Sequence, residues 1–176
     1  MEHVVLLSGT GDPIGTAPKA TVHGAGTPLH LAFSCYLFDE AGRLLLTRRA
    51  LTKQTWPGVW TNSFCGHPGA GEAMEDAVRR HARRELGVEV EDLRVELPHF
   101  RYRAVDPAGV VENEVCPVYR ARTACALVPD PDEVMDLVWV EPDHLTAAAR
   151  LAPWAFSPWL TLQLEQLHPD RTEAVA

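Results

Sequence analysis

Hydrophobic and polar residues alternate along parts of the chain, which predicts β-strands, and recur with a helical period in others. Alternation over Leu29–Phe38 is followed by the turn-forming stretch DEAGR and the apolar run Leu44–Arg48, so we expect a β-hairpin there. The runs Pro98–Val105 and Val110–Arg122 flank the turn-forming stretch DPAG and predict a second strand pair. The other predicted strands are the short runs His3–Leu7 and Leu137–Val140.

Helical spacing predicts one helix in the middle of the chain and two near its end. The run Glu72–Leu86 carries an apolar stripe, and Gly87 is suited to end a helix. Glu85 lies at the edge of that stripe, so we expect its carboxylate to point along the buried side. Pro142–Arg150 and Ser157–Leu167 are the closing helices, the second with a serine cap followed by proline. The stripe consists of Ala77, Val78, Ala82 and Leu86.

This order of elements predicts an α+β fold, an α/β/α sandwich in which helices cover a mixed sheet. The 176 residues suit a single domain with a sizeable core. Ser8–Gly26 is rich in Gly, Pro and Thr and lacks periodicity, so we expect a long ordered loop. We therefore divide the chain into an N-terminal arm (1–28), a main domain (29–168) and a flexible tail (169–176).

Composition and charge narrow the functional classes. Hydrophobic residues make up 46% of the chain and charged residues 23%, which is typical of soluble globular proteins. No apolar run approaches ~18 residues, so we predict no membrane span. No basic segment precedes MEHVVLLSG, so we predict no signal peptide. The net charge of −8 argues against a nucleic-acid partner, because nucleic acid requires a basic face.

The four cysteines show no close paired spacing. They therefore indicate neither a zinc knuckle nor a disulfide framework, and a reducing cytoplasm is the expected compartment. We expect a monomer or a weak homodimer. The cysteines are Cys35, Cys65, Cys116 and Cys125.

Reactive side chains are concentrated in the stretch Thr61–Glu72, TNSFCGHPGAGE. It combines the thiol of Cys65 and the imidazole of His67 with three glycines and a proline. Glycine and proline produce an irregular backbone, the kind of segment that carries reactive groups. Burial as an inert thiol is the usual alternative for a free cysteine, so Cys65 alone leaves both interpretations open.

A second group of candidate residues lies in the stretch ENEVCPV. Strand periodicity places Glu112, Glu114 and Cys116 on one face. Two carboxylates on one face repel each other unless a cation lies between them, so metal binding competes with the alternative of a solvated strand face. Imidazole and carboxylate ligands suit Mn²⁺ or Mg²⁺, with Zn²⁺ as a further choice. The histidines that would join such a site are His23, His30 and His67.

Lysine is rare in this chain. Of its 16 lysines and arginines only two are lysines, Lys19 and Lys53. Lys53 follows Arg48 and Arg49, just before the aromatic loop TWPGVW. Either these lysines have been retained for a function or they lie by chance on two surface loops, and the pattern alone leaves both open.

The segment from Gly66 onward has a recognisable frame. Its members are Gly66, Glu72, Arg80, Glu85 and Gly87. This is the frame of the Nudix box, a loop–helix–loop that holds metal beside a diphosphate. His81 and Arg84 stand where the hydrolase pattern has acids. With CGHP at its front, the segment resembles the type I isopentenyl-diphosphate isomerases, a Nudix-related family that leaves its diphosphate intact.

This resemblance covers nearly the whole chain, from about Lys19 to Leu167. Its most specific pieces, in family order, are RRALTKQTWPGVW, NSFCGHP, the Nudix frame, RYR, ENEVCPV and SPW. It implies a Nudix-like sandwich fold. It also implies an isoprenyl diphosphate as substrate and the interconversion of isopentenyl and dimethylallyl diphosphate through a tertiary carbocation, a step that supplies isoprenoid precursors.

The resemblance also implies roles for individual residues. Cys65 and Glu114 match the family's two proton carriers, and Tyr102 matches the tyrosine that assists the glutamate from the partner strand. Trp159 matches the active-site tryptophan, whose ring stabilises a cation. The alternatives are an ordinary cross-strand aromatic for Tyr102 and a buried apolar residue for Trp159.

Two metal sites and a diphosphate site follow from the same resemblance. A second ion, Mg²⁺, would lie near Glu85 and the Cys65 carbonyl and would meet the diphosphate. The implied ligands of the Mn²⁺ or Zn²⁺ site are His23, His30, His67, Glu112 and Glu114. The implied diphosphate-binding residues are Lys19, Arg49 and Lys53.

Two other functions remain as alternatives. The first is a Nudix pyrophosphohydrolase acting on a nucleotide diphosphate, which the missing acids at His81 and Arg84 disfavour. The second is a non-enzymatic metal or redox sensor built on Cys65 and the histidines. A sensor leaves ENEV, Tyr102 and Trp159 without a role.

Overall fold

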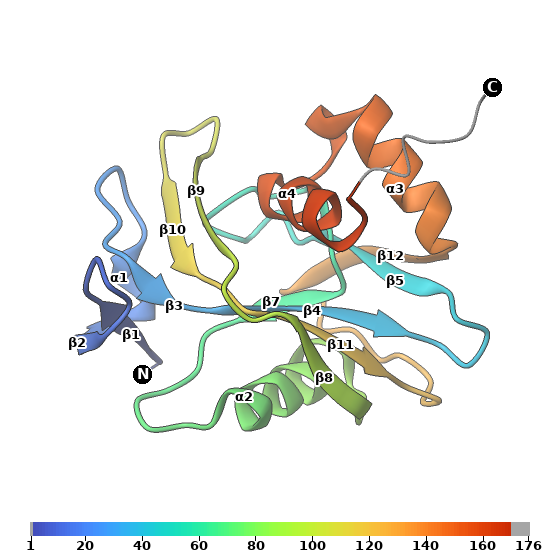
Figure 1. The fold of residues 1–176 in the computed structure, drawn as a ribbon, viewed down its shortest axis with the longest axis horizontal. Coiled ribbons are helices and arrows are strands. Elements are labelled where there is room, and N and C mark those ends of the chain that lie inside the picture. The colour runs from blue at the N-terminus through green and yellow to red at the C-terminus, as the bar shows by residue number, and fades with distance from the viewer. Residues whose placement is uncertain (1, 170–176) are drawn as a thin grey trace.

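The computed structural model describes residues 2–169, whose strands form two sheets (Figure 1). The strands are β1 (His3–Leu7), β2 (Pro13–Pro18), β3 (His30–Leu31), β4 (Phe33–Phe38), β5 (Leu44–Arg49), β6 (Trp60–Thr61), β7 (Phe64–Gly66), β8 (Glu91–Leu97), β9 (Arg101–Val105), β10 (Val111–Val115), β11 (Val118–Arg122) and β12 (Val134–Val140). The helices are α1 (Lys19–Val22), α2 (Met74–His81), α3 (Pro142–Leu151) and α4 (Pro158–Leu167), with a π-helical turn over Ala82–Leu86 and a 3₁₀ turn over Pro153–Ala155.

The larger sheet is covered on both faces by helices. Its strand order is β12–β5–β4–β11–β8, with β6 and β7 paired to β5 and β4, and the smaller sheet has the order β2–β1–β3–β10–β9. Helix α2 lies on one side of the larger sheet, and α3 and α4 lie on the other (Figure 1). The pairs β3–β10 and β4–β11 are parallel among otherwise antiparallel strands. The predicted α+β sandwich is confirmed, but it contains two sheets where we expected one.

Two segments of the chain pass from the smaller sheet into the larger sheet, and both strands are interrupted where they cross. Strand β3 continues into β4 through Ala32, and β10 continues into β11 through Cys116 and Pro117. Ala32 N donates to Val115 O at 2.9 Å, and Ser34 N donates to Pro117 O at 3.0 Å. Pro117 has no N–H of its own, so the ladder cannot continue regularly through it. The hydrophobic alternation over Leu29–Phe38 runs across this break, which is why a single strand is predicted there.

Strand β4 separates two hydrophobic cores. Phe33 and Leu37 pack toward α2, in a core that includes Val78. Tyr36 packs on the opposite side, in a core that includes Leu160 of α4. Successive strand residues point to opposite faces, so the predicted alternation is confirmed and both of its faces are buried.

The N-terminal segment contains regular structure that the sequence does not reveal. The expectation of a loop over Ser8–Gly26 is wrong in part, because β2 and α1 lie within it. Strand β2 pairs antiparallel with β1 at the edge of the smaller sheet, and most of its side chains are exposed. Backbone hydrogen bonds rather than burial hold such a strand, so no hydrophobic period marks it. Residues 170–176 of the predicted tail lie outside the described residues.

The loop before α2 is fixed by a carboxylate. The helix begins at Met74, two residues after the predicted start at Glu72. Glu72 accepts a hydrogen bond from Gly69 N at 2.7 Å and pairs with the Arg80 guanidinium at 2.7 Å. These contacts hold the glutamate outside the helix, facing back along the loop. At the other end, Gly87 has φ of +69° and ends the π-helical turn as predicted.

Two further local expectations differ from the structure. Ser157 occupies the N-cap position of α4, but its hydroxyl lies 2.8 Å from the Thr61 hydroxyl and makes no capping bond. Strand β8 is not predicted at all, because most of its side chains are exposed and polar. The positions of α3, α4, β1 and β12 agree with the prediction to within a few residues at each end.

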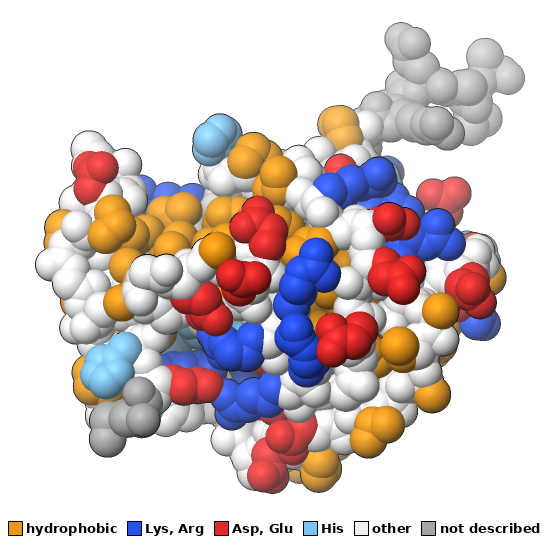
Figure 2. All heavy atoms as spheres, turned by 90° about the horizontal axis from the view of Figure 1, so that it is seen from below, with side chains coloured by type: hydrophobic (Ala, Val, Ile, Leu, Met, Phe, Trp, Pro, Cys, Tyr) orange, Lys and Arg blue, Asp and Glu red, His pale blue; other side chains and the backbone are white. Residues whose placement is uncertain are grey.

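Acidic and basic side chains alternate across the middle of the face shown in Figure 2. That face therefore has no uniform basic patch of the kind that nucleic acid requires. Among residues 2–169, no helix has the length and apolar character required to cross a bilayer.

Candidate active site

Glu114 lies at the centre of the candidate site because both neighbouring strands bring polar side chains to it. Strand β10 pairs with β3, which places Glu114 opposite His30, and with β9, which places it opposite Tyr102. All three side chains are buried. The Tyr102 hydroxyl donates to Glu114 Oε2 at 3.0 Å, and His30 Nε2 lies 3.4 Å from Oε1. The predicted position of Tyr102 on the partner strand is confirmed.

Three histidines from separate segments surround this carboxylate. His23 follows α1, His30 is in β3, and His67 follows β7. One ring nitrogen from each, together with a carboxylate oxygen of Glu114, lie within 4.8 Å of one another. His30 Nδ1 donates to the Pro28 carbonyl at 2.9 Å, which leaves Nε2 facing the cluster. The structure thus brings together four of the five predicted ligands.

Buried polar atoms that make no hydrogen bond indicate that this cluster fits a metal ion. Within residues 2–169 these side-chain atoms are His23 Nε2, His30 Nε2, His67 Nδ1 and Glu112 Oε2. Each such atom costs about 1–3 kcal/mol when it stays unpaired. His23 Nε2 lies 3.2 Å from Glu112 Oε2, His30 Nε2 lies 3.4 Å from Glu114 Oε1, and His67 faces the same oxygen through Nε2 at 3.1 Å. Imidazole nitrogens and carboxylate oxygens gathered in this way are a suitable set of ligands for a divalent ion.

Glu112 lies beside the four-residue group rather than within it. Its Oε2 is 3.2 Å from His23 Nε2, and its Oε1 accepts a hydrogen bond from the Thr55 hydroxyl at 2.6 Å. Glu112 as a fifth ligand therefore stays a prediction, with one oxygen held by Thr55 and the other turned toward the histidines. Thr55 also accepts from Arg49 at 2.8 Å through its carbonyl, so one loop residue holds a carboxylate and a cation.

Charge and burial set the protonation states around Glu114. Burial alone would raise the pKa of Glu114, but hydrogen bonds and charge from His30 and His67 hold it well below its ordinary value. Burial, together with the Glu114 charge, raises the pKa of Tyr102 well above its ordinary value. Burial lowers the pKa of His67 to about 4. The site therefore presents a carboxylate, a phenol that donates to it and an imidazole able to act as a ligand.

Cys65 lies in β7, where strand pairing sets it opposite Ser34. Its sulfur is 3.3 Å from the Ser34 hydroxyl and donates to Asn62 Oδ1 at 3.2 Å. Burial raises the pKa of Cys65 to about 11, and these hydrogen bonds oppose the rise only in part. The Arg49 charge acts to lower this pKa, but burial outweighs it. The group is therefore a protonated thiol.

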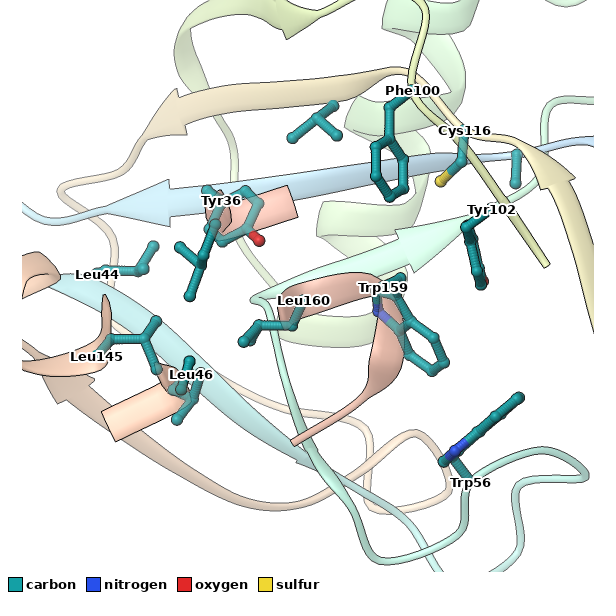
Figure 3. Packing of buried hydrophobic residues seen from close by; sticks show 14 of the residues in the cluster. Tyr36, Leu44, Leu46, Trp56, Phe100, Tyr102, Cys116, Leu145, Trp159 and Leu160 are labelled. Atoms are coloured by element: carbon teal, nitrogen blue, oxygen red, sulfur yellow. The ribbon is translucent and has the colours of Figure 1, made fainter. Parts of the chain in front are cut away.

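Trp159 belongs to an aromatic group at one end of a hydrophobic core (Figure 3). Its ring centroid is 5.4 Å from that of Trp56 in a T-shaped arrangement and 5.8 Å from that of Tyr102. The Arg49 guanidinium carbon lies 5.4 Å from the Trp159 ring centroid, so this ring already faces one cation. Trp56 has φ of +44°, a strained conformation for a bulky residue, which the fold maintains at this group.

One buried amide connects the thiol to the indole, and the sequence pattern does not indicate it. Asn62 is fully buried, and its Oδ1 accepts from Cys65 Sγ at 3.2 Å and from Trp159 Nε1 at 2.9 Å. Its Nδ2 donates to the carbonyls of Cys35 and Phe64 at 3.0 and 2.9 Å, which fixes the orientation of the amide. Asn62 precedes the cysteine in TNSFCG, but only the fold shows where its two ends point.

A cavity of about 640 Å³ joins these groups. Cys65, Glu114 and Trp159 line it, and so do Tyr102 and Glu85. The predicted cations that line the same cavity are Lys19, Arg49 and Lys53. Residues from the N-terminal arm, the central strands and α4 therefore meet around one space, although they are far apart in the sequence.

Comparison with known proteins identifies the family of this chain. A family model described as NUDIX domain matches residues 28–160. A protein named isopentenyl-diphosphate Delta-isomerase from Agromyces mediolanus is 61% identical over 99% of this chain and 88% of its own length. Proteins of the same name from Clavibacter michiganensis subsp. michiganensis and Salmonella arizonae are 61% and 56% identical, over 96% and 92% of this chain and 87% and 89% of their own lengths.

The chain belongs to the isopentenyl-diphosphate Delta-isomerases, within the NUDIX family. Solved structures of other proteins share the fold of this isomerase. A protein from Deinococcus radiodurans has a TM-score of 0.72 at 22% identity, over 95% of this chain and 99% of that one. A MutT protein from Methanosarcina mazei Go1 has a TM-score of 0.63 at 15% identity, over 83% and 97%.

This member of the isomerases departs from the hydrolase box at His81. The histidine is buried, and its Nδ1 lies 2.6 Å from Glu85 Oε1. A Cβ at Gly66 would lie 2.6 Å from the His81 ring, so only glycine fits there. Glu85 itself is buried and lines the cavity with Cys65, as expected. The sequence left the role of His81 open, and the structure shows that it holds the carboxylate expected to bind Mg²⁺.

Proposed function

We propose that this isomerase interconverts isopentenyl and dimethylallyl diphosphate by adding a proton to one carbon and removing a proton from another. The observation that carries the proposal is the position of the Cys65 thiol and the Glu114 carboxylate on one cavity, beside the Trp159 ring. Relatives that are 56–61% identical over nearly the whole chain bear the name of this activity.

The two proton carriers suit a reversible isomerisation. Addition of a proton to the terminal carbon of the double bond forms a tertiary carbocation, and loss of a proton from the carbon on its other side gives the allylic isomer. Each carrier acts as an acid in one direction and as a base in the other. Cys65 supplies a thiol and Glu114 supplies a carboxylate. The Tyr102 hydroxyl donates to Glu114 Oε2 at 3.0 Å and so stabilises the ionised form of Glu114.

The aromatic group suits the carbocation. An indole face stabilises a desolvated cation by about 2 kcal/mol or more. Trp159 is held in place by its hydrogen bond to Asn62 and by its edge contact with Trp56. All three residues are buried, so they also exclude the water that would capture the cation.

The cations and carboxylates on the cavity suit the diphosphate and its metal. We propose that Lys19, Arg49 and Lys53 bind the diphosphate through charge-assisted hydrogen bonds. Glu85 and the Cys65 carbonyl would hold Mg²⁺, which would supply neutralising charge to the bound diphosphate. The residues proposed to hold Mn²⁺ or Zn²⁺ are His23, His30, His67, Glu112 and Glu114.

Hydrolysis of a nucleotide diphosphate is less well supported. His81 and Arg84 replace two acids of the hydrolase pattern, and the His81 imidazole forms a hydrogen bond with Glu85. A reaction at phosphorus develops negative charge, which the Trp159 ring cannot stabilise. We also propose a monomer or weak homodimer in the cytoplasm, where the four cysteines, all free, would stay reduced.

Incubation with isopentenyl diphosphate and Mg²⁺, followed by assay for the acid-labile allylic isomer, tests the proposed activity. We expect the allylic isomer to form and inorganic phosphate to stay at its starting level. A protein that releases phosphate from nucleotide diphosphates and leaves isopentenyl diphosphate unchanged is a hydrolase.

A further inference from the structure

Five charged residues form a series of alternating charge along the lining of the cavity. Lys19 Nζ lies 3.0 Å from one oxygen of Glu2, whose other oxygen contacts the Arg84 guanidinium. Arg84 Nη2 lies 3.4 Å from Glu133, which also contacts Lys53. All five residues line the cavity, and Arg84 is the central cation of the series.

The carboxylates of Glu2 and Glu133 form ion pairs with Lys19 and Lys53, two cations of the predicted diphosphate site. Burial alone would raise the pKa of Glu2, but its contacts with Lys19 and Arg84 lower it to about 2, so it is ionised at neutral pH. The side chains of Arg84 and Glu2 are 45% and 43% exposed. Ion pairs at such exposure contribute at most about 1 kcal/mol, so another anion can replace the carboxylate readily.

A diphosphate is a stronger partner for this guanidinium than a carboxylate. It carries more charge, and the planar guanidinium matches phosphate oxygens with two parallel donors. Arg84 stands where the hydrolase box has an acid, next to Glu85, the expected Mg²⁺ ligand. A cation at this position adds to the binding of a diphosphate and removes a carboxylate that would repel it.

We propose that Arg84 binds the substrate's diphosphate and that Glu2 and Glu133 hold its side chain until the substrate displaces them. This inference rests on the proposed function, because it takes the diphosphate as the ligand of the cavity. Glu2 acts as a competing anion supplied by the N-terminal arm. Its removal therefore has the opposite effect on substrate binding from removal of Arg84.

The neighbouring residue provides a matched control. Arg83 has a side chain 50% exposed and pairs with Glu89 at 2.8 Å, but it does not line the cavity. If Arg84 only fastened the N-terminal strand to the π-helical turn, its loss would affect stability and leave anion binding unchanged. The two arginines therefore separate a ligand-binding role from a structural one.

The test is calorimetric titration with inorganic pyrophosphate in the presence of a chelator, together with steady-state kinetics with isopentenyl diphosphate and Mg²⁺. For Arg84→Gln we expect about tenfold weaker pyrophosphate binding and a KM raised to a similar extent, with kcat within about twofold of wild type. Arg83→Gln should match wild type, and Arg84→Lys should recover part of the lost affinity. Glu2→Gln should bind pyrophosphate more tightly than wild type.

Unchanged pyrophosphate binding by Arg84→Gln, in a variant whose melting temperature shows it folded, overturns the proposal. Weaker binding by Glu2→Gln also overturns it, because Glu2 would then support the site rather than compete for it. The titration reports on Arg84 without turnover. Absence of isomerisation by the wild-type protein would instead contradict the proposed function, whatever the arginine variants show.

Discussion

At the scale of single residues, the proposed chemistry depends on one amide oxygen that also accepts a hydrogen bond from the neighbouring Thr61 hydroxyl at 2.9 Å. Asn62 Oδ1 accepts from the Cys65 thiol and from the Trp159 indole, and the Asn62 nitrogen is fixed by two backbone carbonyls. A proton carrier and a cation-stabilising ring are thereby held in one orientation to each other. Asn62 is a positioning residue, since it acts through these two side chains.

We expect Asn62→Ala to lower kcat at least about tenfold with little change in KM, because the thiol and the indole lose a common partner while the diphosphate contacts remain. Ser63→Ala is the matched control, since Ser63 is equally buried but its hydroxyl bonds to backbone atoms, Leu37 N and Leu45 O. Each variant should lose about 1–3 kcal/mol of stability. Equal kcat in the two variants would show that Asn62 is purely structural.

Trp159 can be tested for cation stabilisation with two apolar replacements. Phenylalanine and leucine both remove the indole N–H, so they differ mainly in the aromatic face. We expect a partial loss of kcat/KM for Trp159→Phe and a further loss of about 2 kcal/mol, roughly thirtyfold, for Trp159→Leu. Melting temperatures establish that both variants fold. If the two turn over equally well, the residue only fills space.

The residues that lie in distinctive motifs could be predicted from the sequence, but the residues that hold them in position could not. Cys65, Glu114 and Tyr102 lie in short segments that identify a family, and the structure places them on one cavity. Asn62 and Thr55 look like ordinary polar loop residues, because their importance depends on burial and on partners far away in the chain.

At the scale of elements, the site lies where strands pass from one sheet to the other. His30 and Glu114 are on the smaller sheet and Ser34 and Cys65 on the larger one, on either side of the break at Ala32. Helices and most strands are visible in the periodicity, since each buries a regular face. The sheet switch and the edge strand β2 are not, because backbone pairing rather than burial decides them.

The loop before α2 gives a pH-dependent prediction. Hydrogen bonds from Arg80 lower the pKa of Glu72 to about 2, although burial acts against them. A folded-state pKa below the unfolded value of about 4.5 contributes stability that is present above that value and is lost as the pH falls toward 2. We expect the melting temperature of wild type to exceed that of Glu72→Gln at pH 6 and the difference to vanish near pH 2. A difference independent of pH would argue against this ion pair.

At the scale of the whole molecule, the metal cluster links the N-terminal arm to the central strands. His23 comes from the arm, while His67 and Glu114 come from separate strands or their ends. An ion held by all of these segments stabilises the folded state by mass action. We therefore expect a bound divalent ion to stabilise the contact between the N-terminal arm and the central strands.

We expect Glu112→Gln to weaken divalent binding and to reduce the rise in melting temperature that added Mn²⁺ produces over chelator. Thr55 can still donate to the amide oxygen, so the loss isolates the oxygen turned toward His23. Glu91→Gln, an exposed glutamate on β8, serves as the control and should respond like wild type. Identical shifts in all three proteins would mean that Glu112 is not a ligand.

The central claim is that Cys65 and Glu114 add a proton to one carbon of the substrate and remove a proton from another, while the diphosphate stays intact. Proton and phosphorus NMR of isopentenyl diphosphate incubated with the enzyme and Mg²⁺ in D₂O tests both parts at once. The account predicts allylic methyl signals, deuterium uptake into the product and a phosphorus spectrum of an unbroken diphosphate ester, with Cys65→Ala slower by at least about 10²–10⁴. Free phosphate or pyrophosphate without the allylic isomer, or full activity of Cys65→Ala, would contradict it.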